Sequence, residues 1–242
     1  VLDITHGGHS LEYARERNEA LAGTNYILNV HLKLDTGMTR IGFFAYDDER
    51  TLDELRQVAQ LPHLHIEGVF MHFCVADSRA EADVSFTKLQ YKRFMDMLSA
   101  MAGVGIRPEI RHCCNSGATI LYPEFALDMV RPGIITYGNA PSDELEGALS
   151  LRPMMSLHSM IAQVRTVPAG TDISYGRLYR TKETTRVAVL PIGYADGLSR
   201  LLTGKASFYL HGAMVPVIGR ICMDMCMLDV SAVPDAKPGD IV

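Results

Sequence analysis

The chain has 242 residues, of which 48% are hydrophobic and 21% are charged, so it can bury a sizeable core. Its net charge is −5 and it has no Lys/Arg block, which argues against a nucleic-acid-binding surface. No apolar run approaches the roughly 20 residues of a membrane-spanning helix. The five cysteines have no regular spacing, which argues against a disulfide framework and favours a cytoplasmic location.

The first 150 residues alternate between short apolar runs and segments with helical periodicity. Strands are expected at residues 26–34, 65–73, 106–110 and 125–130. Helices are expected between them at residues 10–22, 47–60 and 81–101. Ser10 is the expected N-cap of the first helix. In the third helix, Phe86, Leu89, Phe94, Met95 and Leu98 are spaced to form one apolar face.

This alternation of strands and helices predicts a parallel sheet covered by helices. Because no glycine-rich GxGxxG loop follows a strand, part of a (β/α)8 barrel is favoured over a dinucleotide-binding sheet. After residue 151, short strand-like runs separated by Gly, Pro and Asp turns predict a mostly β domain. We therefore expect an α/β chain with a partial barrel at 1–145 and an incomplete β domain at 146–242.

Both ends of the chain are expected to lie inside a longer protein. Val1 is not a start methionine, and the segment 239–242 is typical of an unfinished strand. An absent targeting segment therefore carries little weight.

Polar residues gather where the predicted barrel strands end. In the segment HLKLDTGMTRIG, Lys33 and Asp35 alternate along a strand and so share a face, with Arg40 just beyond. A charged residue there needs a partner. Two interpretations remain open: an ion pair that closes the barrel, or an arginine that holds a substrate carboxylate.

Three further strand ends carry candidate residues. His72 ends one strand, although a lone histidine is more often structural. Ser116 opens a helix after Asn115, as either an N-cap or part of an anion site. Arg131 precedes Gly133, which permits close backbone approach, and a surface arginine before a turn is the alternative.

The β domain holds two turns that each carry a tyrosine among glycines. They are ISYG around Tyr175 and PIGYADG around Tyr194. A tyrosine beside glycine can project from a tight turn, although aromatic residues are more often structural. By itself, the segment GRICMDM around Met223 indicates only a strand with a bulge, and the nearby Cys222 and Cys226 indicate core residues.

Together these segments resemble the alanine racemase family, whose members use pyridoxal 5′-phosphate (PLP). The matching stretches are HLKLDTGMTRIG, MHF…AD, NSGA, RPGI…YG, SYGRLY, PIGYADG and GRICMDM, in the family's order and over essentially the whole chain. The resemblance implies an N-terminal PLP-binding (β/α)8 barrel, a C-terminal β domain, and a homodimer with shared active sites.

The resemblance also implies how PLP is held. Arg131 is similar to the arginine that donates to the pyridine nitrogen. Ser116 and the backbone of Gly133 and Ile134 are similar to the phosphate cradle. His72 is similar to the histidine that links that arginine to the catalytic tyrosine.

Further roles follow from the same resemblance. Tyr175 is similar to the catalytic tyrosine, one of two bases, which reaches the site of the partner subunit. Arg40 is similar to the arginine near the substrate carboxylate, and Lys33 to a lysine that is often carbamylated. Tyr194 and Met223 are similar to substrate-entrance and substrate-binding positions.

The sequence departs from the family pattern at two points. Thr39 stands where the family often has glycine. In addition, none of the six lysines lies in a segment like Lys-Ala-Asn-Ala-Tyr-Gly, which carries the lysine that holds PLP covalently. We expect about three barrel strands and this lysine to lie outside the chain, which alone would then be inactive.

Racemisation of alanine through PLP by a two-base mechanism is the expected activity. The alternatives are a serine racemase of the vancomycin-resistance type, which carries a membrane anchor, and a PLP decarboxylase on the same barrel. A non-catalytic PLP-binding barrel protein is disfavoured because such proteins lack the β domain.

Overall fold

A computed structural model describes residues 4–46 and 48–242. The chain forms two compact units, one that extends to Met155 and one that begins at Ser156. We call them the first and the second unit and describe each by itself. The expected domain limit at residues 145 and 146 stays a prediction.

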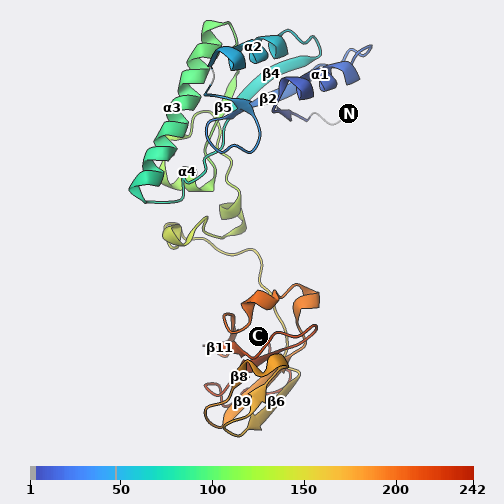
Figure 1. The fold of residues 1–242 in the computed structure, drawn as a ribbon, viewed down its shortest axis with the longest axis vertical. Coiled ribbons are helices and arrows are strands. Elements are labelled where there is room, and N and C mark those ends of the chain that lie inside the picture. Colours follow the sequence, from blue (N-terminus) through green and yellow to red (C-terminus); the bar gives the residue numbers. More distant parts are fainter. Residues whose placement is uncertain (1–3, 47) are drawn as a thin grey trace. The chain divides into compact units, whose positions relative to one another are not determined.

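The first unit is built on a parallel sheet (Figure 1). Its strands are β1 (His6–Gly8), β2 (Leu28–Asp35), β4 (Leu64–Phe70) and β5 (Ile110–His112), in that spatial order, and β3 (Phe43–Phe44) pairs with the end of β2. Neighbours in the sheet follow each other along the chain, with helices in the connections. This is the arrangement of a (β/α)8 barrel wall, so the expected partial barrel is confirmed.

The helices of the first unit begin where the sequence predicts. They are α1 (Leu11–Ala20), α2 (Asp48–Ala59), α3 (Glu81–Gly103) and the short α4 (Ser116–Leu121). The Ser10 side chain accepts a hydrogen bond from the backbone N–H of Tyr13, which confirms the expected N-cap.

Two details of the first unit differ from expectation. Residues 125–130 do not form a strand, because Leu127 takes a left-handed φ of 53° and Asp128 turns back to pair with Arg111 at 2.7 Å. On α3, Leu89 is 40% exposed, whereas Thr87 and Gln90 are fully buried. Gln90 lies inside because its side chain hydrogen-bonds the backbone of the loop after β4.

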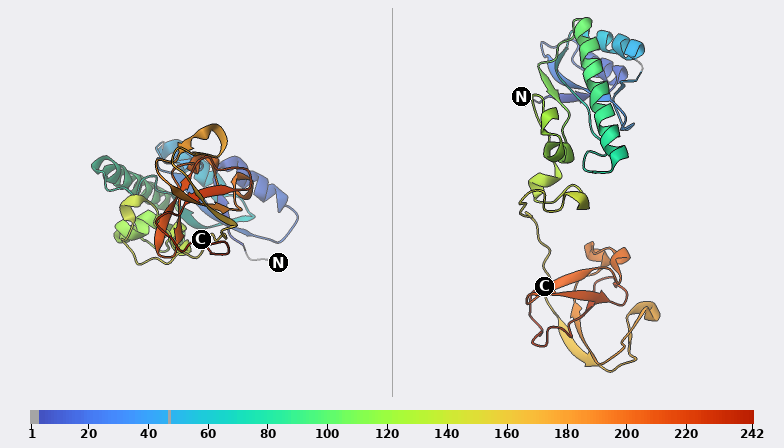
Figure 2. Two further views of the ribbon diagram at one scale, coloured as in Figure 1. Left: turned by 90° about the horizontal axis from the view of Figure 1, so that it is seen from below. Right: turned by 90° about the vertical axis from the view of Figure 1, so that its left-hand side faces the viewer.

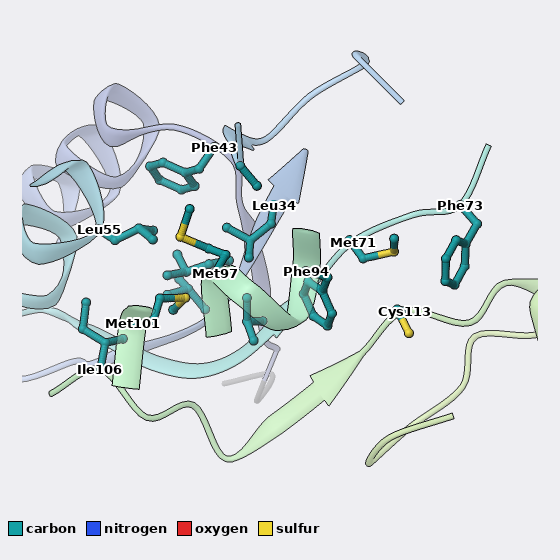
Figure 3. Close-up of a cluster of buried hydrophobic side chains, with 14 of the residues drawn as sticks. Leu34, Phe43, Leu55, Met71, Phe73, Phe94, Met97, Met101, Ile106 and Cys113 are labelled. Atoms are coloured by element: carbon teal, nitrogen blue, oxygen red, sulfur yellow. The ribbon is translucent and has the colours of Figure 1, made fainter. Parts of the chain in front are cut away.

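The core of the first unit lies between α3 and the sheet. Figure 3 shows Phe94, Met97 and Met101 of α3 in one buried cluster with Leu34 of β2 and Met71. All five side chains are fully buried. This packing fixes the carboxyl ends of the strands, where the candidate site residues lie.

The second unit is mostly antiparallel β, as expected. Its sheet has the order β10-β11-β12-β9-β6 and is seen from two directions in Figure 2. The strands are β6 (Gln163–Val167), β9 (Thr185–Leu190), β10 (Ser207–Leu210), β11 (Ala213–Ile218) and β12 (Cys226–Asp229). A separate hairpin joins β7 (Asp172–Ile173) and β8 (Tyr179–Arg180). The first strand of this unit begins only at Gln163, and before it Met160 makes an isolated bridge to Ile241.

Short 3₁₀ helices occupy several loops of both units. They are η1 (Pro123–Phe125), η2 (Ile134–Tyr137), η3 (Asp143–Leu145), η4 (Tyr175–Arg177), η5 (Tyr194–Asp196) and η6 (Arg200–Leu202). Of the helices in the described ranges, none combines the length and the apolar character that a membrane span requires.

Candidate active site

The carboxyl ends of three neighbouring strands bring the candidate residues of the first unit together. In the register of the sheet, Lys33 of β2 lies opposite Phe70 of β4, which lies opposite His112 of β5. His72 follows β4 by two residues. The side chain of Arg131 reaches this edge from a loop whose backbone is tied to Cys114 by a 2.9 Å hydrogen bond.

The guanidinium of Arg131 is held by several acceptors. Its Nη1 lies 2.6 Å from Nδ1 of His112, and its Nη2 donates to the carbonyl oxygen of Met71 at 2.8 Å. Nη2 also lies 3.4 Å from Nδ1 of His72. The guanidinium carbon stands 5.3 Å from the centre of the Phe70 ring. Arg131 is therefore fixed in orientation, with a histidine on each side.

Both histidines beside Arg131 are neutral near pH 7. Burial, together with the positive charge of Arg131, lowers the pKa of His72 to about 4 and that of His112 to about 3. A neutral imidazole has one nitrogen that accepts. Each histidine can therefore accept a hydrogen bond from the arginine, which only donates.

Lys33 is buried, and its ammonium group donates to a backbone carbonyl rather than to a carboxylate of the described residues. It is only 3% exposed, and its Nζ donates to the carbonyl oxygen of Leu34 at 2.9 Å. Burial lowers the pKa of Lys33 to about 8, against the opposing effect of the Asp35 charge. Among the ion pairs of the described residues, none includes Lys33. Asp35 instead accepts from the N–H groups of Gly37 and Thr39, at 3.0 Å each, and so shapes the next loop.

The loop that carries Arg40 passes directly across Lys33. A Cβ on Gly42 would lie 2.7 Å from the carbonyl oxygen and 2.9 Å from Cγ of Lys33, so only glycine permits this approach. Arg40 itself is exposed, and its charge contributes to lowering the pKa values of Lys33 and His72. Arg40, Lys33 and His72 therefore share one positively charged environment.

The two loops with Ser116 and Gly133 meet. The N–H of Gly133 donates to Oγ of Ser116 at 2.9 Å. Across the described ranges, the N–H groups of Ile134 and Ile135 donate to no protein acceptor. Free backbone N–H groups beside a serine hydroxyl are suited to a phosphate group. The arrangement is therefore suited to bind an anion.

In the second unit, Tyr175 projects from a strained turn. Tyr175 is 68% exposed, and its neighbours Ser174, Gly176 and Arg177 have left-handed φ angles of 65°, 73° and 52°. Oγ of Ser174 donates to the carbonyl oxygen of Arg220 at 2.6 Å. Non-glycine residues in this region cost free energy, and such strain is concentrated at functional sites.

A second segment lies against the Tyr175 turn because Gly219 has no side chain. A Cβ on Gly219 would lie 2.8 Å from the carbonyl oxygen of Ile173 and 2.9 Å from Cβ of Ser174. A cavity of about 370 Å³ beside the turn is lined by Tyr175, Ser174 and Cys222, among others. The segment around Gly219 therefore supports the position of Tyr175.

Tyr194 and Met223 lie in two turns that are bonded to each other. The N–H of Tyr194 donates to the carbonyl oxygen of Cys222 at 3.0 Å, and that of Ala195 to Met223 at 2.8 Å. A Cβ on Gly193 would lie 2.4 Å from the same two carbonyl oxygens. Tyr194 is 45% exposed and Met223 61%. The second unit thus presents Tyr175, Tyr194 and Met223 on linked turns.

Sequence reasoning did not give a role to His112, His31 or Glu67. In the structure, these side chains continue the contacts of Arg131 into the sheet. A histidine at the end of a predicted strand was the available signal for His112. The pairing of His31 with Glu67 depends on strand register, which the sequence does not reveal.

Comparison with known proteins gives a consistent family. Residues 2–141 match the family model "Alanine racemase, N-terminal domain", and residues 154–242 match "Alanine racemase, C-terminal domain". The chain is 46% identical to the alanine racemase of Desulfovibrio desulfuricans over 239 residues, which are 99% of this chain and 63% of that protein. It is 44% identical to that of Clostridium tetani, over 97% of this chain and 60% of that protein.

Solved structures agree with these relatives. The alanine racemase of Clostridium difficile 630 has a TM-score of 0.87 at 37% identity, over 98% of this chain and 61% of that one. The alanine racemase from D-cycloserine producing Streptomyces lavendulae has a TM-score of 0.89 at 34% identity, over 99% of this chain and 62% of that one. The chain therefore spans less than two thirds of the length of these relatives.

Proposed function

Because the chain belongs to the alanine racemase family, we propose that the protein interconverts L- and D-alanine with PLP as cofactor. The observation that carries this proposal is the guanidinium of Arg131, fixed between two neutral histidines where three parallel strands end. The amino-acid substrate, the homodimer with shared active sites and the cytoplasmic location are parts of the same proposal. All five cysteines are free thiols, which suits a reducing compartment.

The residues present fit PLP at both of its ends. Ser116, with the backbone of Gly133 and Ile134, would hold the phosphate, since the N–H of Ile134 makes no other hydrogen bond in the described residues. Arg131 would donate to the pyridine nitrogen. When bound, PLP withdraws electrons from the amino acid and so makes the proton on its Cα removable.

Arg131 limits that withdrawal. A guanidinium stays protonated in proteins, so it donates a hydrogen bond to the pyridine nitrogen without transferring a proton. His72 and His112 accept from Arg131 and keep the guanidinium in place. An unprotonated pyridine ring is the weaker electron acceptor, which favours return of the proton over side reactions such as transamination.

We assign proton transfer at one face of Cα to the phenol oxygen of Tyr175. Tyr175 is exposed on a turn of the second unit. A residue that acts in the active site of another subunit must be exposed in this way. Tyr194 and Met223, which are exposed on the linked turns, would line the same substrate site. Two-base chemistry needs a second base on the opposite face of Cα, and we assign that role to the PLP-bound lysine of the full-length protein.

Lys33 is the proposed carbamylation site. The uncharged amine would form the carbamate by adding to dissolved CO₂ with loss of one proton, and the lowered pKa of about 8 makes this amine available near neutral pH. The carbamate would replace the amine of Lys33 with an anionic group, which could pair with the nearby Arg40. Arg40 would then remain oriented to bind the carboxylate of the substrate.

The direct test is to assay the full-length protein with L-alanine and L-serine side by side, with chiral chromatography of the products. The proposal predicts D-alanine formation that depends on added PLP and exceeds D-serine formation. Faster racemisation of serine, or no racemisation of either amino acid by PLP-loaded protein, would contradict it.

A further inference from the structure

We propose that His112, His31 and Glu67 form a one-way hydrogen-bonded row that positions Arg131. We call these three residues the histidine row. The inference rests on the proposed function only for the role of Arg131 toward PLP. The row and its proton positions follow from the structure of the first unit alone.

The row crosses the sheet from strand to strand. Nη1 of Arg131 lies 2.6 Å from Nδ1 of His112 on β5. Nε2 of His112 lies 2.8 Å from Nδ1 of His31 on β2, and Nε2 of His31 lies 3.1 Å from Oε2 of Glu67 on β4. Each of these short contacts needs one donor and one acceptor.

Arginine fixes the direction of the whole row. Its guanidinium can only donate, so Nδ1 of His112 must accept and carries no proton. The proton of neutral His112 is then on Nε2, which donates to Nδ1 of His31. The proton of His31 is therefore also on Nε2, and it is donated to Glu67. Both rings thus hold a single, defined tautomer.

Glu67 is a consistent end point for the row. Besides His31, its carboxyl oxygens accept from Oγ1 of Thr5 at 2.8 Å and from Nδ2 of Asn29 at 3.3 Å. Among the described residues, the polar groups that contact the Glu67 carboxyl are thus donors or can act as donors.

The backbone makes room for the row. A Cβ on Gly68 would lie 2.6 Å from the ring of His31, so the ring lies where a side chain at residue 68 would be. A register shift between Val30 and His31 places His31 opposite Gly68. On the other side, the ring of Phe70 stacks on His112 at 5.0 Å with an interplanar angle of 3°. Both rings of the row are thus held by the shape of the sheet.

An extra proton on the row would disrupt the hydrogen bond that Arg131 donates to His112. With both nitrogens of His31 protonated, its Nδ1 would donate to Nε2 of His112, and the His112 proton would move to Nδ1. That N–H would then face the N–H of Arg131, a repulsive arrangement. Among the described residues, the charged or titratable groups near the row and Arg131 include Lys33 and His72, the thiols of Cys113 and Cys114, and Glu67. The positive charges of Arg131 and Lys33 oppose an extra proton on the row, whereas the Glu67 carboxylate favours one. Arg131 keeps its contact with His112 while the row holds two protons.

The test is nitrogen NMR of the PLP-loaded full-length protein with ¹⁵N-labelled histidine. The proposal predicts that His31 and His112 are both neutral at pH 7, with the proton on Nε2. A proton on Nδ1 of either ring, or a doubly protonated ring at pH 7, would overturn it. The readout does not depend on racemase activity. An inactive protein with both protons on Nε2 would support the row and overturn the proposed function.

Substitutions distinguish a role of the histidine row in positioning Arg131 from a purely structural role. In Gly68→Ala the new methyl group displaces the His31 ring, so Nε2 of His112 loses its acceptor and its ¹⁵N signal should shift. The affinity of the apoprotein for PLP should fall about tenfold or more, the effect of weakening one hydrogen bond to a charged group. The matched control is Gly103→Ala, where a Cβ meets nothing within 4 Å.

Glu67→Gln keeps an accepting oxygen and should preserve the His112 signal, whereas Glu67→Leu should not. Glu109→Gln, a change at an exposed residue outside the row, should leave all signals unchanged. Equal PLP affinity and unchanged histidine signals in Gly68→Ala and Gly103→Ala would overturn the positioning role.

Discussion

The support of Tyr175 by Gly219 can be tested by adding one methyl group. In Gly219→Ala, the new Cβ would lie 2.8 Å from the carbonyl oxygen of Ile173 and 2.9 Å from Cβ of Ser174. Backbone atoms cannot rotate away as a flexible side chain does. We therefore expect the turn with Ser174 and Tyr175 to move.

Two separate contributions set the magnitude. An L-residue at the left-handed φ of 69° costs roughly 1–2 kcal/mol. The steric conflict adds about 1–3 kcal/mol, as overpacking generally does. Gly204→Ala is a matched control, since Gly204 has a φ of 66° but open space where the Cβ would be. The free energy of unfolding should thus fall by roughly 2–5 kcal/mol in Gly219→Ala and by roughly 1–2 kcal/mol in Gly204→Ala.

Activity should separate the two variants further. A displacement of a catalytic group by about 1 Å costs on the order of 100-fold in rate. We expect kcat for alanine to fall about that much in Gly219→Ala and to stay near the wild-type value in Gly204→Ala. Urea unfolding and steady-state racemisation of the two full-length variants provide the measurements. Equal kcat values in the two variants would show that Gly219 does not position Tyr175.

Three other changes have defined outcomes. Thr39 is exposed and has a left-handed φ of 54°, so Thr39→Gly should raise the free energy of unfolding by about 1 kcal/mol. Thr184 lies outside the left-handed region, so the control Thr184→Gly should not raise it. A lower free energy of unfolding in Thr39→Gly would refute the strain argument. Arg131→Glu should allow protonation of the pyridine nitrogen and so produce a new long-wavelength absorption band with alanine. If the PLP-loaded variant shows no such band, Arg131 has only a structural role. Burial lowers the pKa of Lys33 from 10.5 to about 8 in the folded protein. Below pH 8 the Lys33 amine is therefore charged in both the folded and the unfolded state. Between pH 8 and 10.5 it binds the proton only in the unfolded state. Stability relative to Lys33→Met should therefore rise by about 3 kcal/mol over this range in CO₂-free buffer, and a flat difference would contradict an uncharged, unmodified amine.

The sequence was informative where a local pattern determines the local structure. Ser10 caps α1 because its hydroxyl can reach the N–H of Tyr13 within the same turn. The glycines around Tyr175 and Tyr194 indicated tight turns, and both tyrosines lie in such turns. These features depend on neighbours within a few residues, so a single sequence reveals them.

Features that depend on distant partners were missed. The apolar segment 125–130 was expected to be a strand, but Asp128 is drawn into a pair with Arg111, 17 residues away. Gln90 was not among the residues expected on the apolar face of α3, yet it is buried because its side chain hydrogen-bonds the backbone of Cys74 and His72. The histidine row depends on the register of three strands, which hydrophobic patterns do not specify.

The central claim, that Tyr175 transfers the proton on one face of Cα, is tested most directly by deuterium exchange. The Tyr175→Phe variant of the full-length protein is incubated with PLP in D₂O and with either L- or D-alanine, and deuterium uptake at Cα is followed by mass spectrometry. Because each base serves one face, exchange from L-alanine should be lost while exchange from D-alanine largely persists. An equal loss for both enantiomers, with PLP still bound, would contradict the account.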